Sequence, residues 1–188
     1  LVSSCRFIFN FAGAYCREGN HQDLALAKHG LRFLTSAHQM PDGFYAWELT
    51  AGQVSDGRAM AYGHAFVLFD ALQAGLASAQ SVLDEVWSLL EQHFWEPAHG
   101  AYLDELSWSE REPDGYRGQN ANMHMCEACL AAWKATREEK FLDRAEQLAQ
   151  KFALELADLN SGLVWEHYTQ DWLPDMDYHK DQPDDLFK

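Results

Sequence analysis

Helical patterns of two kinds alternate along the chain. In the stretches 61–77 and 120–133 most positions are apolar, and each stretch holds a single charged residue. In the stretches that follow, 81–95 and 138–156, apolar residues recur every three or four positions and leave one polar face. A helix that is apolar all round is typically buried on all sides, whereas a helix with one apolar stripe covers a core from outside. The pattern therefore predicts pairs of helices, each with an inner and an outer member.

Three such pairs are predicted, and a strand-like run follows each of them. The first pair covers about 1–15 and 22–38, and Asn20 is well suited to cap its second helix. The strand-like runs are 44–49, 101–106 and 162–168. The first two match at Gly, Tyr, Glu and Leu, and the third is one residue shorter before its Glu. A period of about 60 residues indicates a repeat architecture in which no unit can bury its core alone.

Inner helices wrapped by outer ones predict an all-α fold, an (α/α)6 toroid barrel with short β-hairpins in its long loops. The links within pairs are short, near 78–80 and 136–138, and the links between pairs are long. The long loops should gather at the end where the inner helices begin, and function is expected there. Three pairs make half of a six-pair ring. Residues 1–188 are therefore predicted to be the N-terminal half of a single barrel catalytic domain.

Composition narrows the partners and the compartment. A net charge of −15 and a pI of about 4.8 argue against a nucleic-acid partner, because neutralising phosphates requires clustered Lys and Arg. No window approaches the roughly 18 apolar residues that a membrane span needs. No signal peptide is visible, although one could precede Leu1. The four cysteines do not resemble a disulfide scaffold, so a cytoplasmic location is expected. A homo-oligomer is left open.

The inner helices carry a few polar residues close to where they begin. Asn120, His124 and Glu127 fall at i, i+4 and i+7, so a helix would place them on one face. Together with them, the residues expected to gather at this end of the barrel are Arg6, Tyr62, His64 and Asn122. Unpaired buried polar groups are costly, so their convergence from three repeats favours a pocket that binds a polar ligand such as a sugar.

Each of these residues also has a plainer interpretation. A histidine on a mostly apolar helix is more often a hydrogen-bonded core residue than a catalytic one. Asn120 could cap its helix. Glu127 could form an ion pair with Arg6 or with Arg117.

Three other groups of residues were weighed as sites. Cys126 and Cys129 have metal-like spacing but lie within one helix without a second pair, so core packing is favoured and no metal site is predicted. The acidic loop 175–181, which includes His179 and Asp181, lacks the Gly and terminal Glu of a calcium-hand loop and is expected at the barrel rim. Sugar stacking and core packing both remain open for the aromatic residues Tyr45, Trp47, Trp108, Trp165 and Trp172.

Several motifs resemble those of the N-acylglucosamine 2-epimerase superfamily, which includes N-acylglucosamine 2-epimerases, cellobiose 2-epimerases and mannose isomerases. The resemblance rests on Arg6, on Tyr62-Gly-His64-Ala-Phe, and on Arg117-Gly-Gln-Asn120-Ala-Asn122-Met-His124-x-x-Glu127-Ala. It extends to Trp165-Glu-His167 and Trp172-x-Pro-Asp-x-Asp177-Tyr-x-x-Asp181-x-Pro. The family fold is an (α/α)6 barrel, in agreement with the repeat.

The resemblance implies that Arg6, Tyr62, Asn120 and His124 contact the sugar, and Glu127 is added as a further binding residue. It also implies a pair of histidines that exchange the C2 proton through an enediolate, without a cofactor. Those histidines belong to the second half of the family barrel, in motifs that this sequence does not contain. His124 is therefore expected to support the reaction, and His64 and Asn122 to lie behind the residues that touch the sugar.

The first functional hypothesis is a sugar isomerase that interconverts mannose and fructose. Deprotonating a carbon next to a carbonyl needs a base and a donor for the developing oxyanion, and the second need suits Arg6 or a neutral His124. The runner-up is an N-acylglucosamine or related 2-epimerase. More distant alternatives are a glycoside hydrolase with Glu127 and Asp177 as paired carboxylates, and a non-catalytic carbohydrate-binding protein.

Overall fold

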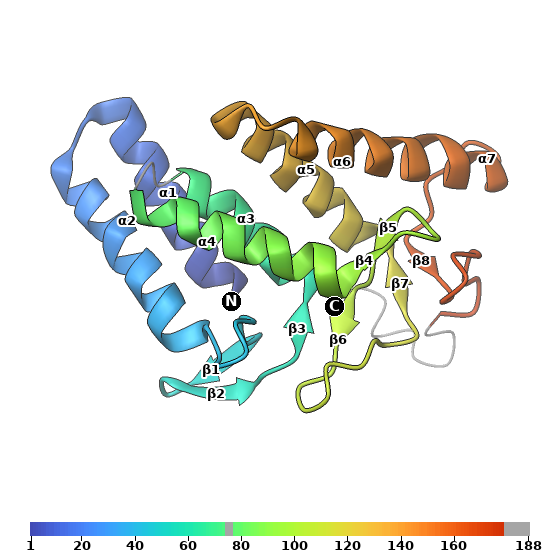
Figure 1. Ribbon diagram of the computed structural model, residues 1–188, viewed down its shortest axis with the longest axis horizontal. Coiled ribbons are helices and arrows are strands. Elements are labelled where there is room, and N and C mark those ends of the chain that lie inside the picture. Colours follow the sequence, from blue (N-terminus) through green and yellow to red (C-terminus); the bar gives the residue numbers. More distant parts are fainter. Residues whose placement is uncertain (74–76, 179–188) are drawn as a thin grey trace.

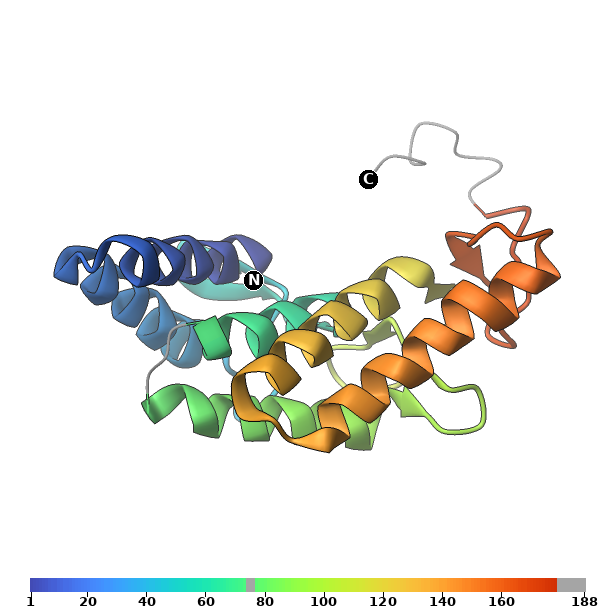
Figure 2. The same cartoon turned by 90° about the horizontal axis from the view of Figure 1, so that it is seen from above.

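Three helix pairs form the body of the computed structural model, which describes residues 1–73 and 77–178. The inner helices are α1 (Val2–Glu18), α3 (Ala61–Gln73) and α5 (Gln119–Thr136). The outer helices are α2 (His21–Phe33), α4 (Ala77–Leu89) and α6 (Glu139–Gln150). Each inner helix packs on the outer helix that follows it, and α3 lies between α1 and α5 (Figures 1 and 2). The predicted alternation of inner and outer helices is confirmed.

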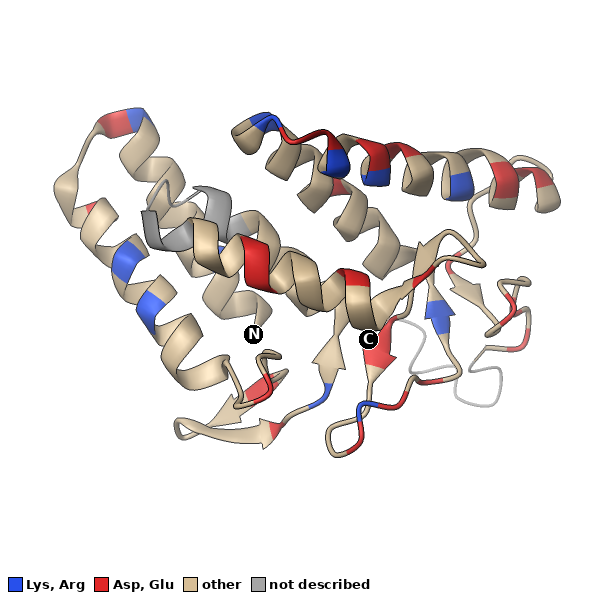
Figure 3. Ribbon diagram, in the orientation of Figure 1, with Lys and Arg blue, Asp and Glu red and all other residues tan. Residues whose placement is uncertain are grey.

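Sequence and environment agree for these two layers. The outer helix α6 carries charges along its length, whereas the inner helix α5 is almost free of them (Figure 3). Fully buried side chains from both layers make one core, including Ile8, Leu34, Leu68, Leu83, Leu90, Phe94, Met125 and Phe141. Within the described ranges, no helix combines the length and the apolar character that a membrane crossing requires.

Each outer helix closes with a π-helical segment. These segments are Leu34–His38, Leu90–Phe94 and Lys151–Leu156, and the short helix α7 (Ala157–Leu159) follows the third. The first two lead directly into extended residues, Gln39 and Trp95. A π-helical segment at the same place in all three helix pairs is further support for a structural repeat.

Short antiparallel strand pairs lie in the long loops. The strands are β1 (Glu48–Thr50), β2 (Gln53–Asp56), β3 (Ala59–Met60), β4 (Trp95–Glu96), β5 (Ala101–Tyr102), β6 (Glu105–Leu106), β7 (Arg117–Gly118) and β8 (His167–Tyr168). They pair as β1–β2, β3–β6, β4–β5 and β7–β8. The β1–β2 turn is Ala51-Gly52, and both of its residues have positive φ, as a two-residue hairpin turn of type I′ requires.

The predicted strand-like runs are shorter than expected, and the first two change their pairing partner midway. In the run 101–106, β5 pairs back with β4, and β6 pairs with β3, which precedes α3. The run 44–49 contributes only a bridge from Tyr45 to Gln39 and the start of β1. The run 162–168 keeps only β8. Each run therefore joins its own outer helix to the start of an inner helix.

Backbone hydrogen bonds at the start of the inner helices define a common register for the three repeats. The backbone nitrogens of Leu1, Ala61 and Gln119 donate to the carbonyl oxygens of Trp47, Asp104 and Glu166, at 2.9, 2.8 and 3.0 Å respectively. Glu105 pairs with Met60 as His167 pairs with Gly118. The expectation that the third run is one residue shorter is therefore wrong, since Glu166 occupies the place of Asp104 rather than of Glu105.

Helix boundaries differ from the predictions mainly between α3 and α4. Residues 78–80, predicted as the link, already belong to α4, because an Ala-rich stretch without Gly or Pro favours helix. α3 ends at Gln73 and α4 begins at Ala77, and residues 74–76 lie outside the described ones. The predicted short link between α5 and α6 is confirmed at Arg137 and Glu138. Asn20 is confirmed as the N-cap of α2, where its Oδ1 accepts from Gln22 N at 3.0 Å.

Candidate functional site

The three inner helices together line a pocket of about 330 Å³. Its lining residues are Arg6, Phe9 and Asn10 from α1, Ala65, Phe66 and Phe69 from α3, and His124 and Glu127 from α5. Three of the five residues predicted to bind substrate, namely Arg6, His124 and Glu127, therefore meet in one cavity.

The common register explains why these side chains meet. Leu1, Ala61 and Gln119 occupy equivalent positions, and the residues five places after them are Arg6, Phe66 and His124. Three places further, close to one helical turn, are Phe9, Phe69 and Glu127. The pocket is therefore built from two tiers of equivalent positions on α1, α3 and α5. Polar groups occupy the α1 and α5 sides of the first tier, and an aromatic ring stands between them.

His124 has its orientation fixed by a carboxylate and two aromatic rings. Its Nδ1 lies 3.1 Å from Glu127 Oε2, so Nδ1–H donates to the carboxylate. The ring meets Tyr62 edge-on at 5.0 Å and lies tilted against Phe66, also at 5.0 Å between centroids. Nε2 has no hydrogen-bond partner among the described residues. A neutral imidazole held in this way offers Nε2 as an acceptor, and a protonated one offers it as a donor.

Arg6 supplies the positive charge of the pocket. Its guanidinium carbon lies 5.3 Å from the centroid of Phe66, which is a cation–π distance. It forms no ion pair with any residue in the described ranges, so the expected alternative of an Arg6–Glu127 pair is wrong. The other alternative is also wrong, because Arg117 donates its Nε to Glu96 at 2.9 Å. The Arg6 guanidinium can therefore bind an oxygen of a ligand.

Tyr62 and Asn120 lie one turn closer to the start of their helices than Phe66 and His124. Tyr62 is half-buried and contacts Trp47 edge-on at 6.3 Å, in addition to His124. Asn120 is exposed, and the N-cap of α5 is Gly118 rather than Asn120. The capping interpretation of Asn120 is therefore wrong. Neither residue is among those lining the pocket, and both flank it on the side of the long loops.

His64 and Asn122 lie behind this face and perform the same task in successive repeats. His64 Nδ1 donates to Met60 O at 2.8 Å, and its Nε2 accepts from Tyr45 N at 3.1 Å. Asn122 Nδ2 donates to Gly118 O at 3.1 Å and to the carbonyl of Tyr102 at 3.0 Å, and its Oδ1 accepts from Tyr102 N at 2.7 Å. Both side chains are fully buried. Burial lowers the pKa of His64 to about 4, so the ring is neutral.

Sequence reasoning missed five residues that line the pocket, and all of them except Asn10 are apolar. Phe9 and Asn10 stand three and four residues after Arg6, the spacing at which helical residues share a face. Phe66 and Phe69 occupy the α3 positions that correspond to His124 and Glu127 on α5. The helical spacing was visible in the sequence, whereas the alignment of the repeats needed the backbone hydrogen bonds.

The cysteine pair and the described part of the acidic loop, which are the other candidate sites, lie outside the pocket lining. Cys126 is half-buried, Cys129 is buried, and burial raises the pKa of both thiols. Asp175 Oδ1 accepts from Asp177 N at 3.0 Å in an exposed loop, while His179 and Asp181 lie outside the described residues.

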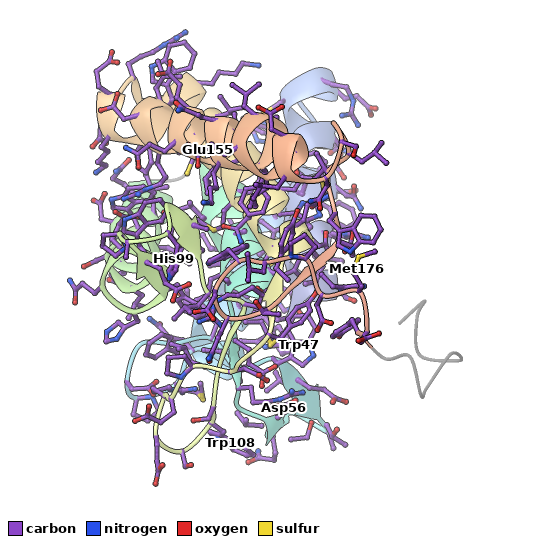
Figure 4. All side chains as sticks on the ribbon, turned by 90° about the vertical axis from the view of Figure 1, so that its right-hand side faces the viewer. Trp47, Asp56, His99, Trp108, Glu155 and Met176 are labelled. Atoms are coloured by element: carbon purple, nitrogen blue, oxygen red, sulfur yellow. The ribbon has the colours of Figure 1, made fainter. Side chains whose placement is uncertain are left out.

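The aromatic residues near the hairpins divide into buried and partly exposed ones. Tyr45 and Trp172 are buried, and Trp165 packs against the core while partly exposed. Trp47 is also partly exposed, and its ring contacts Tyr62. Trp108 stays 49% exposed, at the same end of the molecule as Asp56 (Figure 4).

Comparisons with known proteins identify the family of this chain. The family model described as N-acylglucosamine 2-epimerase (GlcNAc 2-epimerase) matches residues 1–188. The chain belongs to the N-acylglucosamine 2-epimerase family. A D-mannose isomerase from Marinomonas mediterranea is 48% identical over 192 residues, which covers 100% of this chain and 49% of that protein. One from Thermobifida fusca is 40% identical over 164 residues, covering 84% of this chain and 40% of that protein.

Solved structures of this family give the fold. The crystal structure of a D-mannose isomerase superposes with a TM-score of 0.95 at 46% identity, covering 100% of this chain and 49% of that one. A cellobiose 2-epimerase from Spirochaeta thermophila superposes at 0.85 with 22% identity, covering 93% and 47%, and supports the fold alone. The chain thus spans about half the length of these relatives. The predicted (α/α)6 barrel class is confirmed, and the three helix pairs correspond to about half of such a barrel.

Proposed function

We propose that the protein containing this chain is a sugar isomerase that interconverts mannose and fructose. The observation that carries the proposal is the arrangement of Arg6 and His124 at equivalent positions on α1 and α5, facing one pocket. The 48% identity to a D-mannose isomerase supports the choice of substrate. In this proposal the pocket holds the part of the sugar where charge develops.

The reaction moves one proton between neighbouring carbons. A base removes the proton from C2 of the open-chain aldose, the electron pair moves into a C1–C2 double bond, and the carbonyl oxygen becomes an oxyanion. Transfer of the O2 proton to the O1 oxyanion, with return of a proton to C1 and formation of the carbonyl at C2, gives the ketose. Return to the opposite face of C2 gives the epimer instead. Donors aimed at the developing oxyanion supply much of the stabilisation in reactions of this kind.

The residues of this chain fit the oxyanion side of that reaction. Arg6 offers a permanent positive charge, and His124 offers Nε2 on a ring that Glu127 fixes through Nδ1 at 3.1 Å. With Nδ1–H donated to Glu127, Nε2 can donate a hydrogen bond to the oxyanion only in a ring that carries a proton on both nitrogens. We expect the groups that exchange the C2 proton to lie outside this chain, so His124 supports the reaction. Tyr62 and Asn120 would hold hydroxyl groups at the mouth.

Incubation of the full-length protein with mannose in D2O tests the proposal. Isomerisation would yield fructose that carries deuterium at C1. The family match keeps an N-acylglucosamine 2-epimerase as the second candidate. A mannose pool that stays unchanged while N-acetylmannosamine is converted would reject the isomerase and support the epimerase.

A further inference from the structure

Asp104 connects the starts of the two inner helices that carry Tyr62 and His124. Its backbone carbonyl accepts from Ala61 N, the first residue of α3, at 2.8 Å. Its side chain reaches in the other direction, where Oδ2 accepts from Gly118 N at 2.6 Å. Gly118 is the N-cap of α5 and has no capping side chain of its own. One residue therefore bonds to the beginning of both helices.

The fit around the Asp104 carboxylate is close. The residue is only 8% exposed. A Cβ added to Gly118 would lie 2.9 Å from Asp104 Oδ1 and 2.7 Å from the hydroxyl of Tyr116. The backbone of Gly118 is extended, with φ −132°, so glycine is needed here for space rather than for its conformational freedom. The carboxylate and the start of α5 thus hold each other at a fixed distance.

The first repeat lacks this connection, although it has an equivalent residue; in the third repeat no inner helix after α5 lies within the described residues. Trp47 and Glu166 occupy the same register position, and their carbonyls bond to Leu1 and Gln119 in the same way. The Trp47 indole packs beside Tyr62, and Glu166 is exposed. Within the described ranges, only Asp104 sends its side chain at this position to the backbone of the next inner helix.

We propose that Asp104 is a positioning residue that sets where α5 begins relative to α3, and thereby places His124 against Tyr62 and in the pocket. The inference rests on the proposed function for its effect on turnover. The centroid distance of 5.0 Å between the Tyr62 and His124 rings is the quantity that Asp104 maintains. A displacement of about 1 Å at a reacting group can cost about a hundredfold in rate.

The surroundings of Asp104 indicate that an acceptor, rather than a negative charge, is what this position needs. Burial raises the pKa of Asp104 to about 7, against the opposing effects of the Gly118 N–H and of Arg117. Asp114 and Glu166 add to the rise, and the guanidinium of Arg117 is already bonded to Glu96. An Asn side chain would present the same acceptor to Gly118 without burying a charge.

Three variants of the full-length protein test this role. Asp104→Asn keeps an acceptor for Gly118 N–H, Asp104→Leu removes it at similar size, and Gly118→Ala forces the two groups apart. We expect Asp104→Leu to lower kcat by about 30- to 100-fold with a smaller change in KM, since the displaced group acts mainly in the transition state. Asp104→Asn should stay within about threefold of wild type. Glu166→Gln is the control, because it removes an acidic charge at the equivalent position of the third repeat. It should leave kcat and KM at their wild-type values.

Measurements on the folded protein separate positioning from stability. The NMR signal of the His124 ring senses the ring currents of Tyr62 and Phe66, so it should move in Asp104→Leu and in Gly118→Ala but not in Asp104→Asn. Faster amide exchange in the first turn of α5 should accompany the shift. If Asp104→Leu does not fold, Gly118→Ala serves in its place.

Two results would overturn the role of Asp104. One is an unmoved His124 signal with wild-type kcat in folded Asp104→Leu or Gly118→Ala. The other is an Asp104→Asn variant as impaired as Asp104→Leu, which would require the charge itself. If wild type converts no sugar, the proposed function fails, and the His124 signal still decides whether Asp104 positions the helix.

Discussion

Two histidines on neighbouring inner helices show how this fold separates framework from site. His64 on α3 is fully buried, and both of its ring nitrogens bond to the backbone, at Met60 O and Tyr45 N. The His124 side chain on α5 is 20% exposed, and among the described residues only its Nδ1 is bonded, to Glu127. His64 has no nitrogen left for a ligand, whereas His124 presents one to the pocket. The useful distinction between them is the number of unbonded ring atoms rather than the residue type.

The same contrast appears between neighbours on one helix. Asn122 and His124 stand two residues apart on α5, so they point to different sides of the helix. Asn122 repeats the bonds of His64 one unit later and ties α5 to Tyr102. These two repeats therefore fix their hairpins with one side of α3 and of α5, while the other side varies between Phe66 and His124.

Replacement of His124 should give the largest effect on turnover. We expect His124→Ala to lower kcat/KM by about 10²- to 10³-fold, the usual loss when one donor to a developing oxyanion is removed. Because the side chain lies at a pocket and, within the described part of the chain, has its one hydrogen bond with the exposed Glu127, the melting temperature should change little. Steady-state kinetics on mannose and a thermal unfolding curve check both parts. Wild-type kinetics would contradict the site assignment.

Replacement of His64 should have the opposite profile. His64→Ala leaves the Tyr45 N–H and the Met60 carbonyl without their partner, at about 1–3 kcal/mol for each buried group that stays unpaired. We expect the free energy of unfolding to fall by about 3 kcal/mol while the folded fraction keeps its kcat. His64→Asn copies the group used at Asn122 and should recover most of the loss in a urea titration. Equal free energies of unfolding for His64→Ala and wild type would show that the two hydrogen bonds of His64 contribute nothing to stability.

The pH dependence of stability offers a finer test of His64. Its pKa is about 4 in the folded protein and 6.5 in the unfolded chain, so only the unfolded chain takes up a proton as the pH falls through this range. Stability from this group is complete above pH 6.5 and declines below it, by about 1.4 kcal/mol at pH 5.5. Unfolding is measured for wild type and His64→Asn at pH values above 6.5 and at pH 5.5. The difference between their free energies of unfolding should change by that amount. The same dependence of the unfolding free energy on pH in both proteins would refute the low pKa of His64.

The sequence predicted the architecture well because its signals are periodic and local. Apolar residues all round 61–77 and 120–133 predicted the inner helices, which the structure places at 61–73 and 119–136, and Asn20 marked the start of an outer one. The pocket residues on α5 followed from the helical spacing of His124 and Glu127. These features depend on the 3.6-residue period, which the sequence displays directly.

Other features depended on contacts between distant residues and were not predictable in the same way. The run 101–106 divides between two partners, β4 and β3, and no local pattern records that change. The bond from Asp104 to Gly118 N joins residues whose proximity only the folded chain reveals. Phe66 and Phe69 became pocket residues only once the register aligned them with His124 and Glu127.

Replacement of Glu127 should give the smallest of these effects and distinguishes two chemistries. Glu127→Gln keeps an oxygen that accepts from His124 Nδ1–H, but a charge-assisted bond is about twice as strong as a neutral one, so we expect turnover to fall only about fivefold. A glycoside hydrolase that used Glu127 as a catalytic carboxylate would lose essentially all activity. Its predicted partner Asp177 lies in an exposed loop outside the pocket lining, which favours the mild outcome. Kinetics on mannose and on a mannose disaccharide would separate the two, and complete loss of mannose turnover would give Glu127 a larger role than orienting His124.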